Sequence, residues 1–282
     1  MSAIGFKCPN GDRVKFEDCY AGCNHRCMAL PALKATGAPH WFGKPSVTQL
    51  LSPTRAMYLQ IVKDYYLNPH GSIAAMIGTS MHAIMEDNCP INWIMEARLS
   101  DDITSGAFDA YDAENRTLYD FKNYGAYKVA MALGMKGVWQ KKIITRGKNK
   151  GEERWEQKFV GGGVRHVHDV ALQMNYYRIL MQKKGLPVKK MMVQVFVRGG
   201  VDKTARNYGV TEPTYLIPIN PISDKWVRMY FEMKYKRLMT AIEKNELPPV
   251  CKENERWGDR RCKDYCEVNE FCPYWQENYG GA

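Results

Sequence analysis

The sequence predicts an α/β fold, with a central mixed β-sheet flanked by helices and a small cysteine-rich metal module at each end. Residues 103–124 have the pattern of a β-hairpin whose two faces differ in chemistry. Helical and strand patterns alternate on both sides of this hairpin. Eight of the nine cysteines lie in two groups near the chain ends. The predicted domains are a module over 1–45, a core over 46–246 and a tail over 247–282 that packs on the core.

Composition narrows the class of protein. The 282 residues are 45% hydrophobic and 12% aromatic, which is enough for a sizeable core. The formal charge of +10 indicates a polyanionic partner. No run approaches the ~20 apolar residues of a membrane helix, so no membrane partner is expected. The first residues lack the apolar centre of a signal peptide, so we expect a cytoplasmic location.

The predicted N-terminal module contains four cysteines with ten, three and three residues between them. Four such thiolates suit zinc or an iron–sulfur cluster, and His25 or His40 could replace one of them. Disulfides and simple burial are the alternatives. A segment this short has little core, so a metal would supply its folding energy. The predicted ligands are Cys8, Cys19, Cys23 and Cys27.

Three helices are predicted before the hairpin. Ser46 and Gln49 form a capping-box pattern that begins the first. The second starts at Ser52-Pro53 and is expected to reach residue 66. The third, over 73–88, places His82 and Glu86 on one face because they are four residues apart. A strand containing Glu96 follows over 91–99.

The register of the hairpin follows from its turn at residues 113–116. If the turn is centred between residues 114 and 115, Asp109 faces Asp120 and Ala107 faces Lys122. Strand side chains alternate, so Asp109, Asp120 and Lys122 share one face. Facing carboxylates destabilise a sheet, and a bound divalent cation would reverse that effect. The other face carries aromatic and small residues that suit a core; the alternative is an exposed hairpin with scattered charges.

The segment 126–165 is a basic insertion. Nine Lys or Arg residues stand against three Glu between residues 126 and 160, with Tyr127, Trp139 and Trp155 interleaved. This mixture suits phosphate contacts and base stacking on single-stranded nucleic acid, and a solvated insertion is the alternative. The glycines at 161–163 suggest mobility. The predicted DNA-binding residues are Lys128, Lys141, Lys142, Arg146, Lys148 and Lys150.

The remaining elements are a helix over 167–184, strands over 189–198 and 214–219 separated by a loop, and a helix over 224–245. The first helix places Asp169, Gln173 and Tyr177 on one face. The tail then carries a second group of four cysteines. Its predicted metal ligands are Cys251, Cys262, Cys266 and Cys272.

Several short motifs occur in an informative order: Gly78-x3-His82, Asp109, Asp120-Phe121-Lys122 and Gln173-x3-Tyr177. This order resembles the PD-(D/E)XK nuclease superfamily, in particular its RecB-like and CRISPR-associated exonuclease branch, over roughly residues 46–275. The resemblance implies a restriction-endonuclease-like core and a Mg²⁺- or Mn²⁺-dependent deoxyribonuclease. It further implies an exonuclease that hydrolyses phosphodiester bonds in single-stranded or end-containing DNA. Recombination, repair and phage or defence DNA processing in a bacterial cytoplasm, by a bacterial or phage-encoded protein, are the implied settings.

The resemblance also assigns roles to residues. It implies that His82, Asp109, Asp120 and the carbonyl group of Phe121 hold the ion, and an imidazole ligand favours Mn²⁺. Lys122 would orient the attacking water or stabilise charge on the phosphorus centre. Gln173 and Tyr177 would contact DNA or support the active site.

The tail resembles the cysteine cluster of this branch, which carries a 4Fe–4S cluster; zinc is the alternative. The sequence departs from the pattern because Cys251 is a local fourth ligand and because three residues separate Cys262 and Cys266. Either Cys251 or an N-terminal cysteine would complete the cluster. Recombination or CRISPR-type proteins are the implied protein partners. The alternative function is a non-catalytic DNA-binding module held together by metal.

Overall fold

The computed structural model describes residues 3–22, 27–36, 41 and 43–280. Backbone contacts divide the chain into two compact units, and each is described by itself. Unit 1 comprises Met1–Asn88, Arg98–Ala107 and Ile222–Ala282, and unit 2 comprises Cys89–Ala97 and Phe108–Pro221. Both contain helices and strands, so the α/β expectation is confirmed at this level. Among the helices of the described residues, none combines the length and apolar character that a membrane crossing requires.

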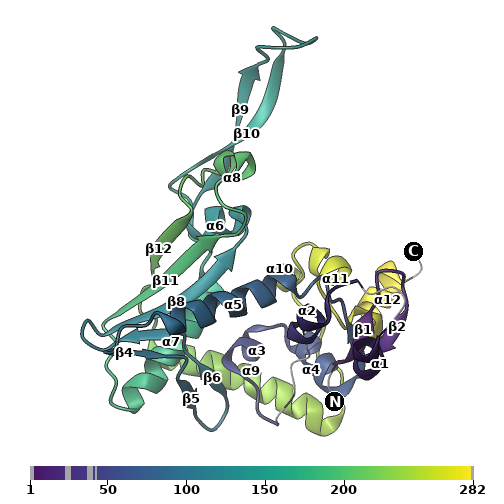
Figure 1. Ribbon diagram of the computed structural model, residues 1–282, viewed down its shortest axis with the longest axis vertical. Helices are drawn as coiled ribbons and strands as arrows, with labels where there is room; N and C mark the ends of the chain where they lie inside the picture. The colour runs from purple at the N-terminus through teal and green to yellow at the C-terminus, as the bar shows by residue number, and fades with distance from the viewer. Residues whose placement is uncertain (1–2, 23–26, 37–40, 42, 281–282) are drawn as a thin grey trace. The chain divides into compact units, whose positions relative to one another are not determined.

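Unit 2 is built on a five-stranded mixed sheet of order β12-β11-β8-β7-β4. Strand β8 lies parallel to β11 and antiparallel to β7, while the other two pairings are antiparallel. Figure 1 shows these strands side by side. Their bounds are β4 (Trp93–Met95), β7 (Ala110–Asp112), β8 (Thr117–Tyr124), β11 (Lys190–Val197) and β12 (Thr214–Pro218).

The predicted hairpin is present with its predicted turn at residues 113–116. Ala110 pairs with Tyr119 and Asp112 with Thr117, which is the expected register. The expected pairing of Ala107 with Lys122 is wrong. Ala107 ends β6 (Ser105–Ala107), which pairs with β5 (Arg98–Ser100) in a separate two-stranded sheet of unit 1. The expected strand over 91–99 is accordingly divided into β4 and β5, because the backbone bends between them.

The segments between β8 and β12 complete unit 2. Helix α7 (His168–Lys183) packs against β8 and has eleven buried residues, and its bounds match the predicted helix. The basic insertion forms α6 (Ala126–Ala132) and an antiparallel pair, β9 (Lys136–Ile143) and β10 (Glu153–Val160). The expected loop after β11 contains α8 (Lys203–Asn207), because the side chain of Asp202 caps it by accepting a hydrogen bond from the Ala205 amide at 2.7 Å.

Unit 1 is organised around α9 (Asp224–Lys244). This helix buries Val227, Phe231, Lys234, Leu238 and Ala241, a spacing of three or four residues that forms one continuous face. Helices α3 and α4 pack against it. The other helices of the unit are α1 (Phe16–Ala21), α2 (Leu30–Ala35), α3 (Val47–Leu51), α4 (Thr54–Val62) and α5 (Ile73–Asp87), followed in the tail by α10 (Glu253–Arg256), α11 (Arg260–Asp264), the 3₁₀ helix η1 (Asn269–Phe271) and α12 (Pro273–Tyr279).

The first and third of the expected N-terminal helices begin where predicted. The capping box of Ser46 and Gln49 is formed, and α5 covers the predicted range. The second helix ends at Val62 rather than residue 66, because Tyr65–Leu67 form strand β3 parallel to β1 (Ala3–Lys7). With β2 (Arg13–Lys15), these strands make a three-stranded sheet of order β2-β1-β3.

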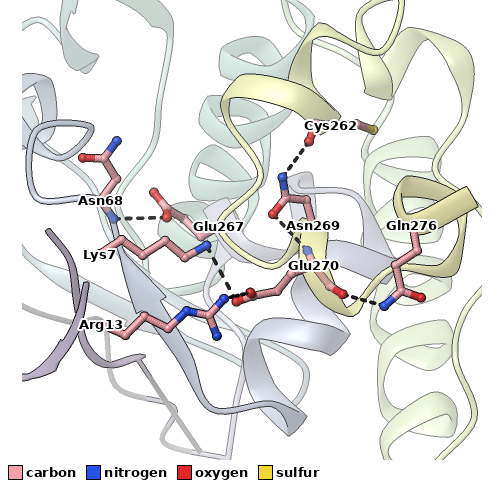
Figure 2. A network of polar contacts seen from close by, with 8 residues as sticks. All are labelled: Lys7, Arg13, Asn68, Cys262, Glu267, Asn269, Glu270 and Gln276. Atoms are coloured by element: carbon pink, nitrogen blue, oxygen red, sulfur yellow. Dashed lines mark hydrogen bonds and ion pairs between the residues drawn. The ribbon is translucent and has the colours of Figure 1, made fainter. Parts of the chain in front are cut away.

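The N-terminal sheet and the C-terminal tail are joined by charged groups (Figure 2). The Glu270 carboxylate of η1 forms ion pairs with Lys7, at 3.7 Å, and with Arg13. The Glu267 carboxylate accepts a hydrogen bond from the Asn68 amide at 3.3 Å. The two cysteine-bearing ends of the chain are therefore in contact within unit 1.

A lysine occupies one buried position of α9. Lys234 is 6% exposed, and its ammonium group donates a hydrogen bond to the Ser52 carbonyl at 2.7 Å and lies 3.7 Å from the Glu255 carboxylate. Burial lowers the pKa of Lys234, and Glu255 opposes that shift. The side chain thus links the α3–α4 connection to the tail through α9.

We expect Lys234→Met to destabilise the protein by about 1–3 kcal/mol, because the Ser52 carbonyl loses a charged donor. Urea unfolding followed by circular dichroism measures the change. Lys236→Met, at an exposed position of the same helix, is the matched control and should stay within about 0.5 kcal/mol of the parent. Equal midpoints for both variants would contradict a linking role for Lys234.

Candidate active site

Two buried carboxylates and one ammonium group meet where β7 begins beside β8 in unit 2. Asp120 and Lys122 share a face of β8 because they are two residues apart, and Asp109 immediately precedes β7. The Lys122 Nζ lies 2.7 Å from Asp120 Oδ2 and 3.9 Å from Asp109 Oδ2. Asp109 and Asp120 are only 6% and 3% exposed. The structure therefore brings together three of the residues predicted to act in catalysis.

The backbone fixes this arrangement. Asp109 Oδ2 accepts a hydrogen bond from the Phe121 amide at 2.6 Å, which ties the bend before β7 to the middle of β8. The Lys122 ammonium group is 3.4 Å from the Phe121 carbonyl oxygen and donates to it. Burial disfavours the charged form of Lys122, but the carboxylates of Asp120 and Asp109 outweigh burial and raise its pKa. Lys122 is therefore a fixed cation at neutral pH.

Glu96 is a site residue for which the sequence analysis assigned no role. Its backbone has a positive φ of 46°, which is unusual for a non-glycine residue. Its amide donates to the Asp109 carbonyl at 3.0 Å, so the bend after β4 lies against the bend before β7. Carboxylate oxygens of Glu96 and Asp109 lie within 4.8 Å of each other. In the sequence, Glu96 is a lone acidic residue in an otherwise apolar strand pattern, and this could have indicated a role at the site.

Helix α7 supplies two more of the predicted residues. Gln173 and Tyr177 lie one turn apart and are 8% and 4% exposed. Burial raises the pKa of Tyr177, the nearby Asp120 and Asp109 carboxylates raise it further, and a hydrogen bond from Gln173 opposes them. The phenol of Tyr177 therefore stays protonated and is held beside Asp120.

The charge balance of this cluster fits a divalent cation. The Lys122 ammonium group lies near the carboxylates of Asp109 and Asp120, and the Glu96 carboxylate lies within 4.8 Å of that of Asp109. The cluster thus has two more negative than positive charges in a largely buried setting, which is costly unless it is compensated. Hard oxygen ligands of this kind suit Mg²⁺ or Mn²⁺. Glu96, Asp109, Asp120 and the Phe121 carbonyl are the groups of unit 2 that could hold such an ion.

Further groups follow the same face of β8 beyond Lys122. The Lys128 ammonium group of α6 lies 4.1 Å from the centre of the Tyr124 ring. Desolvation lowers the pKa of Lys128, the Asp169 carboxylate opposes that shift, and Lys122 and Arg198 reinforce it. Burial raises the pKa of Tyr124 to about 12. Lys128 and Arg198 thus add two positively charged groups near Lys122, at the end of β8.

Other predicted residues lie elsewhere in the chain. His82 is half-buried on α5, which belongs to unit 1, so its role as a ligand of the ion stays a prediction from the sequence. The remaining predicted DNA-binding residues lie on the β9–β10 pair and the loop that joins its strands. They are Lys141, Lys142, Arg146, Lys148 and Lys150.

The four tail cysteines form a second cluster, in unit 1. The pKa of Cys251 is raised to about 11. Burial is the largest cause, and the charges of Glu255 and of the other three thiols add to it. The Cys272 sulfur lies 3.5 Å from a guanidinium nitrogen of Arg55, and the Cys262 carbonyl accepts a hydrogen bond from Asn269 at 3.1 Å (Figure 2). No three of these sulfurs belong to a group of ligand atoms within 4.8 Å of one another in the described chain.

The N-terminal cysteines are described only in part. Cys19 is buried in α1, and Cys8 and Cys27 are half-buried. Cys23 lies outside the described residues, as do His25 and His40. The N-terminal metal site therefore stays a prediction.

Comparison of the chain with protein-family models, with curated proteins and with solved structures found no match.

We expect Glu96→Gln to weaken Mn²⁺ binding by at least about tenfold, because a ligand charge is lost from the cluster. Isothermal titration with MnCl₂ measures this. Glu114→Gln, in the exposed turn of the same hairpin, is the matched control and should bind like the parent. Unchanged affinity in Glu96→Gln would exclude Glu96 from the ion site.

Proposed function

We propose that the protein is a metal-dependent DNA nuclease that hydrolyses phosphodiester bonds. The observation that carries this proposal is the position of Lys122, whose ammonium group is held at 2.7 Å from Asp120 and 3.9 Å from Asp109 beside a third carboxylate. A divalent ion among these carboxylates would supply Lewis-acid charge to the phosphodiester and acidify a water molecule. The motif order favours an exonuclease that acts on single-stranded or end-containing DNA, within a restriction-endonuclease-like core.

Lys122 acts as a fixed cation rather than a base. The two carboxylates raise its pKa, so the ammonium group keeps its proton at neutral pH. A protonated lysine at this position donates hydrogen bonds to a phosphate oxygen as negative charge develops on it. Ion pairs with two buried carboxylates fix its position, so little reorganisation is needed when the phosphate binds.

Tyr177 and Gln173 are positioning residues in this proposal. The raised pKa of Tyr177 keeps its hydroxyl group protonated beside Asp120. A hydrogen bond from Gln173 fixes the direction of that hydroxyl group. His82 of α5 is the proposed imidazole ligand, carried over from the sequence motif.

We expect Lys122→Ala to abolish cleavage while DNA binding stays within about threefold of the parent, because the lost group acts on the developing charge. The assay uses linear and circular DNA with Mg²⁺ or Mn²⁺, and fluorescence anisotropy measures binding. Lys190→Ala, at an exposed position of the neighbouring strand β11, is the control and should cleave normally. Unchanged cleavage in Lys122→Ala removes Lys122 from the mechanism, and a parent that binds but never cleaves indicates a non-catalytic DNA-binding module.

An iron–sulfur cluster is the proposed cofactor of the tail. The other three thiols raise the pKa of Cys251, and Cys272 raises the pKa of Cys262 and Cys266, so the four lie in one neighbourhood. Tetrahedral zinc would hold its four sulfurs about 3.8 Å apart. In the described chain no three tail sulfurs lie within 4.8 Å of one another, so a single ion would require them to move closer. A cluster of several irons holds its thiolates farther apart than one ion does, which is why an iron–sulfur cluster is the proposed group.

We expect the anaerobically purified protein to be brown and to contain about four iron atoms per chain. Cys266→Ser should lose the colour and the iron, because one thiolate ligand is removed. Cys89→Ser, which changes a cysteine outside both groups, is the control and should keep both. A colourless parent with stoichiometric zinc would overturn the assignment.

A further inference from the structure

The β9–β10 pair forms a ribbon, defined here as residues 136–160. Its strands pair antiparallel from Lys136 with Val160 to Ile143 with Glu153. All eight residues of β9 are exposed, and Figure 1 shows the ribbon extending beyond the five-stranded sheet of unit 2. A two-stranded ribbon without a covering layer gains little stability from packing. Its length and composition therefore require another explanation.

The base of the ribbon is fixed to unit 2. The Gly163 amide donates to the Gly134 carbonyl at 2.8 Å, which closes the neck where the chain enters and leaves. A Cβ atom at Gly134 would lie 2.7 Å from the Gly163 carbonyl oxygen, so only glycine permits this approach. Tyr208, after α8, packs edge-on against Phe159 at 5.0 Å and Tyr127 at 5.4 Å. These contacts hold the base of the ribbon against unit 2, and the mobility that the glycines at 161–163 suggest stays a prediction.

The register divides the ribbon into two faces of different chemistry, because strand side chains alternate. One, the aromatic face, carries Trp139 and Trp155 with their rings exposed and Lys141 between them. The Lys141 ammonium group lies 5.9 Å from the centre of the Trp155 ring. The opposite, basic face consists of Lys136, Val138, Gln140, Lys142, Arg154, Glu156, Lys158 and Val160.

The two tryptophans are diagonal neighbours on the aromatic face. Trp139 pairs with Gln157 and Trp155 with Lys141, so their positions are two residues apart along the ribbon. They are 64% and 62% exposed, values that leave the ring faces accessible to another molecule. Polar side chains, those of Gln157 and Lys141, stand beside them. Ile143, 60% exposed, is the other large apolar side chain exposed on this face, and the polar side chains interrupt the apolar surface between the two rings.

The ribbon also has a strong charge. It holds eight Lys or Arg residues against three Glu, a net charge of +5. Glu153 and Glu156 pair within the strands, with Lys141 at 2.7 Å and Lys142 at 3.0 Å. The loop that joins the strands carries Arg146, Lys148 and Lys150 and no acidic residue before Glu152. The positive charge is therefore concentrated at the tip.

We propose that the ribbon binds single-stranded nucleic acid, with Trp139 and Trp155 stacking on unpaired bases and the basic tip contacting phosphates. This inference rests on the proposed nuclease function and names the form of its substrate. Exposed aromatic rings stack on any unpaired base, whereas a duplex hides base faces within its own stack. The charge of the ribbon complements a polyphosphate backbone. Because the ribbon is part of unit 2, it presents the strand to the same unit that carries Asp120 and Lys122.

The test measures binding of the full chain to a fluorescein-labelled oligothymidylate and to a duplex of equal length, in EDTA so that no cleavage occurs. Trp139→Ala combined with Trp155→Ala should weaken binding to the oligothymidylate at least about tenfold, since each stacked base contributes about 1–3 kcal/mol. Duplex binding should change less than about twofold. Trp226→Ala, at an exposed tryptophan of α9, is the matched control and should match the parent. Thermal melting verifies that each variant is folded.

A charge variant separates stacking from phosphate contacts. Replacing Arg146, Lys148 and Lys150 by Glu should weaken binding to both the oligothymidylate and the duplex. It should also flatten the salt dependence of binding. The double tryptophan variant should keep the salt slope of the parent. If the double tryptophan variant loses affinity for the duplex and for the single strand equally, the stacking role is overturned. The same holds if it loses affinity for neither. Binding of the parent to phosphatidylserine vesicles but not to the oligothymidylate would also overturn it.

The outcomes for the ribbon and for the nuclease are distinguishable. Binding in EDTA does not depend on cleavage, so a parent that binds by stacking but never cleaves supports the ribbon and contradicts the nuclease. Conversely, the double tryptophan variant should still cleave a nitrophenyl phosphodiester of a single nucleoside at the parental rate, since this small substrate needs only the site around Lys122. Normal cleavage of long single strands by the same variant would show that the ribbon does not hold the substrate.

Discussion

The contact between the Lys122 ammonium group and the buried carboxylates of Asp120 and Asp109 is the constraint on which unit 2 depends. Two buried acidic side chains side by side are unfavourable without a compensating cation. Lys122 compensates part of their charge, and the Phe121 amide fixes the direction of one carboxylate. The carboxylate of Glu96, close to that of Asp109, adds a further negative charge to this cluster. The fold thus maintains an unbalanced cluster at considerable cost, which is typical of sites kept for function rather than stability.

The register of the hairpin was predictable because two local rules agreed. Turn-forming residues fixed its centre, and alternation of polar and apolar residues fixed its faces. Both rules act over a few residues, so the β7–β8 pairing followed from the sequence alone. For the residues before Ala110 the predicted pairing fails, because β7 begins at Ala110 and Asp109 lies outside the sheet. The same kind of bend, at the positive φ of Glu96, hid a site residue inside an apparently continuous strand.

Long-range packing determined the structure of segments that local sequence patterns did not predict. Tyr65–Leu67 have helix-compatible neighbours, yet they form a strand because β1 offers backbone partners from the start of the chain. The basic insertion has charged residues on both faces, and these weakened the two-residue period that would have predicted β9 and β10. The motif residues Gln173 and Tyr177 were predictable as a pair on one helix face. Their place beside Asp120 depends on how α7 packs against β8.

The ion pairs of Glu270 with Lys7 and Arg13 have a consequence for synthesis of the chain. Unit 2 lies between segments of unit 1, so its residues leave the ribosome before the tail does. The first strands of unit 1 can therefore meet their acidic partner, Glu270, only after all of unit 2 has been synthesised. The contact between the N-terminal strands and the tail therefore forms late, whereas folding in the usual order begins with the N-terminal part.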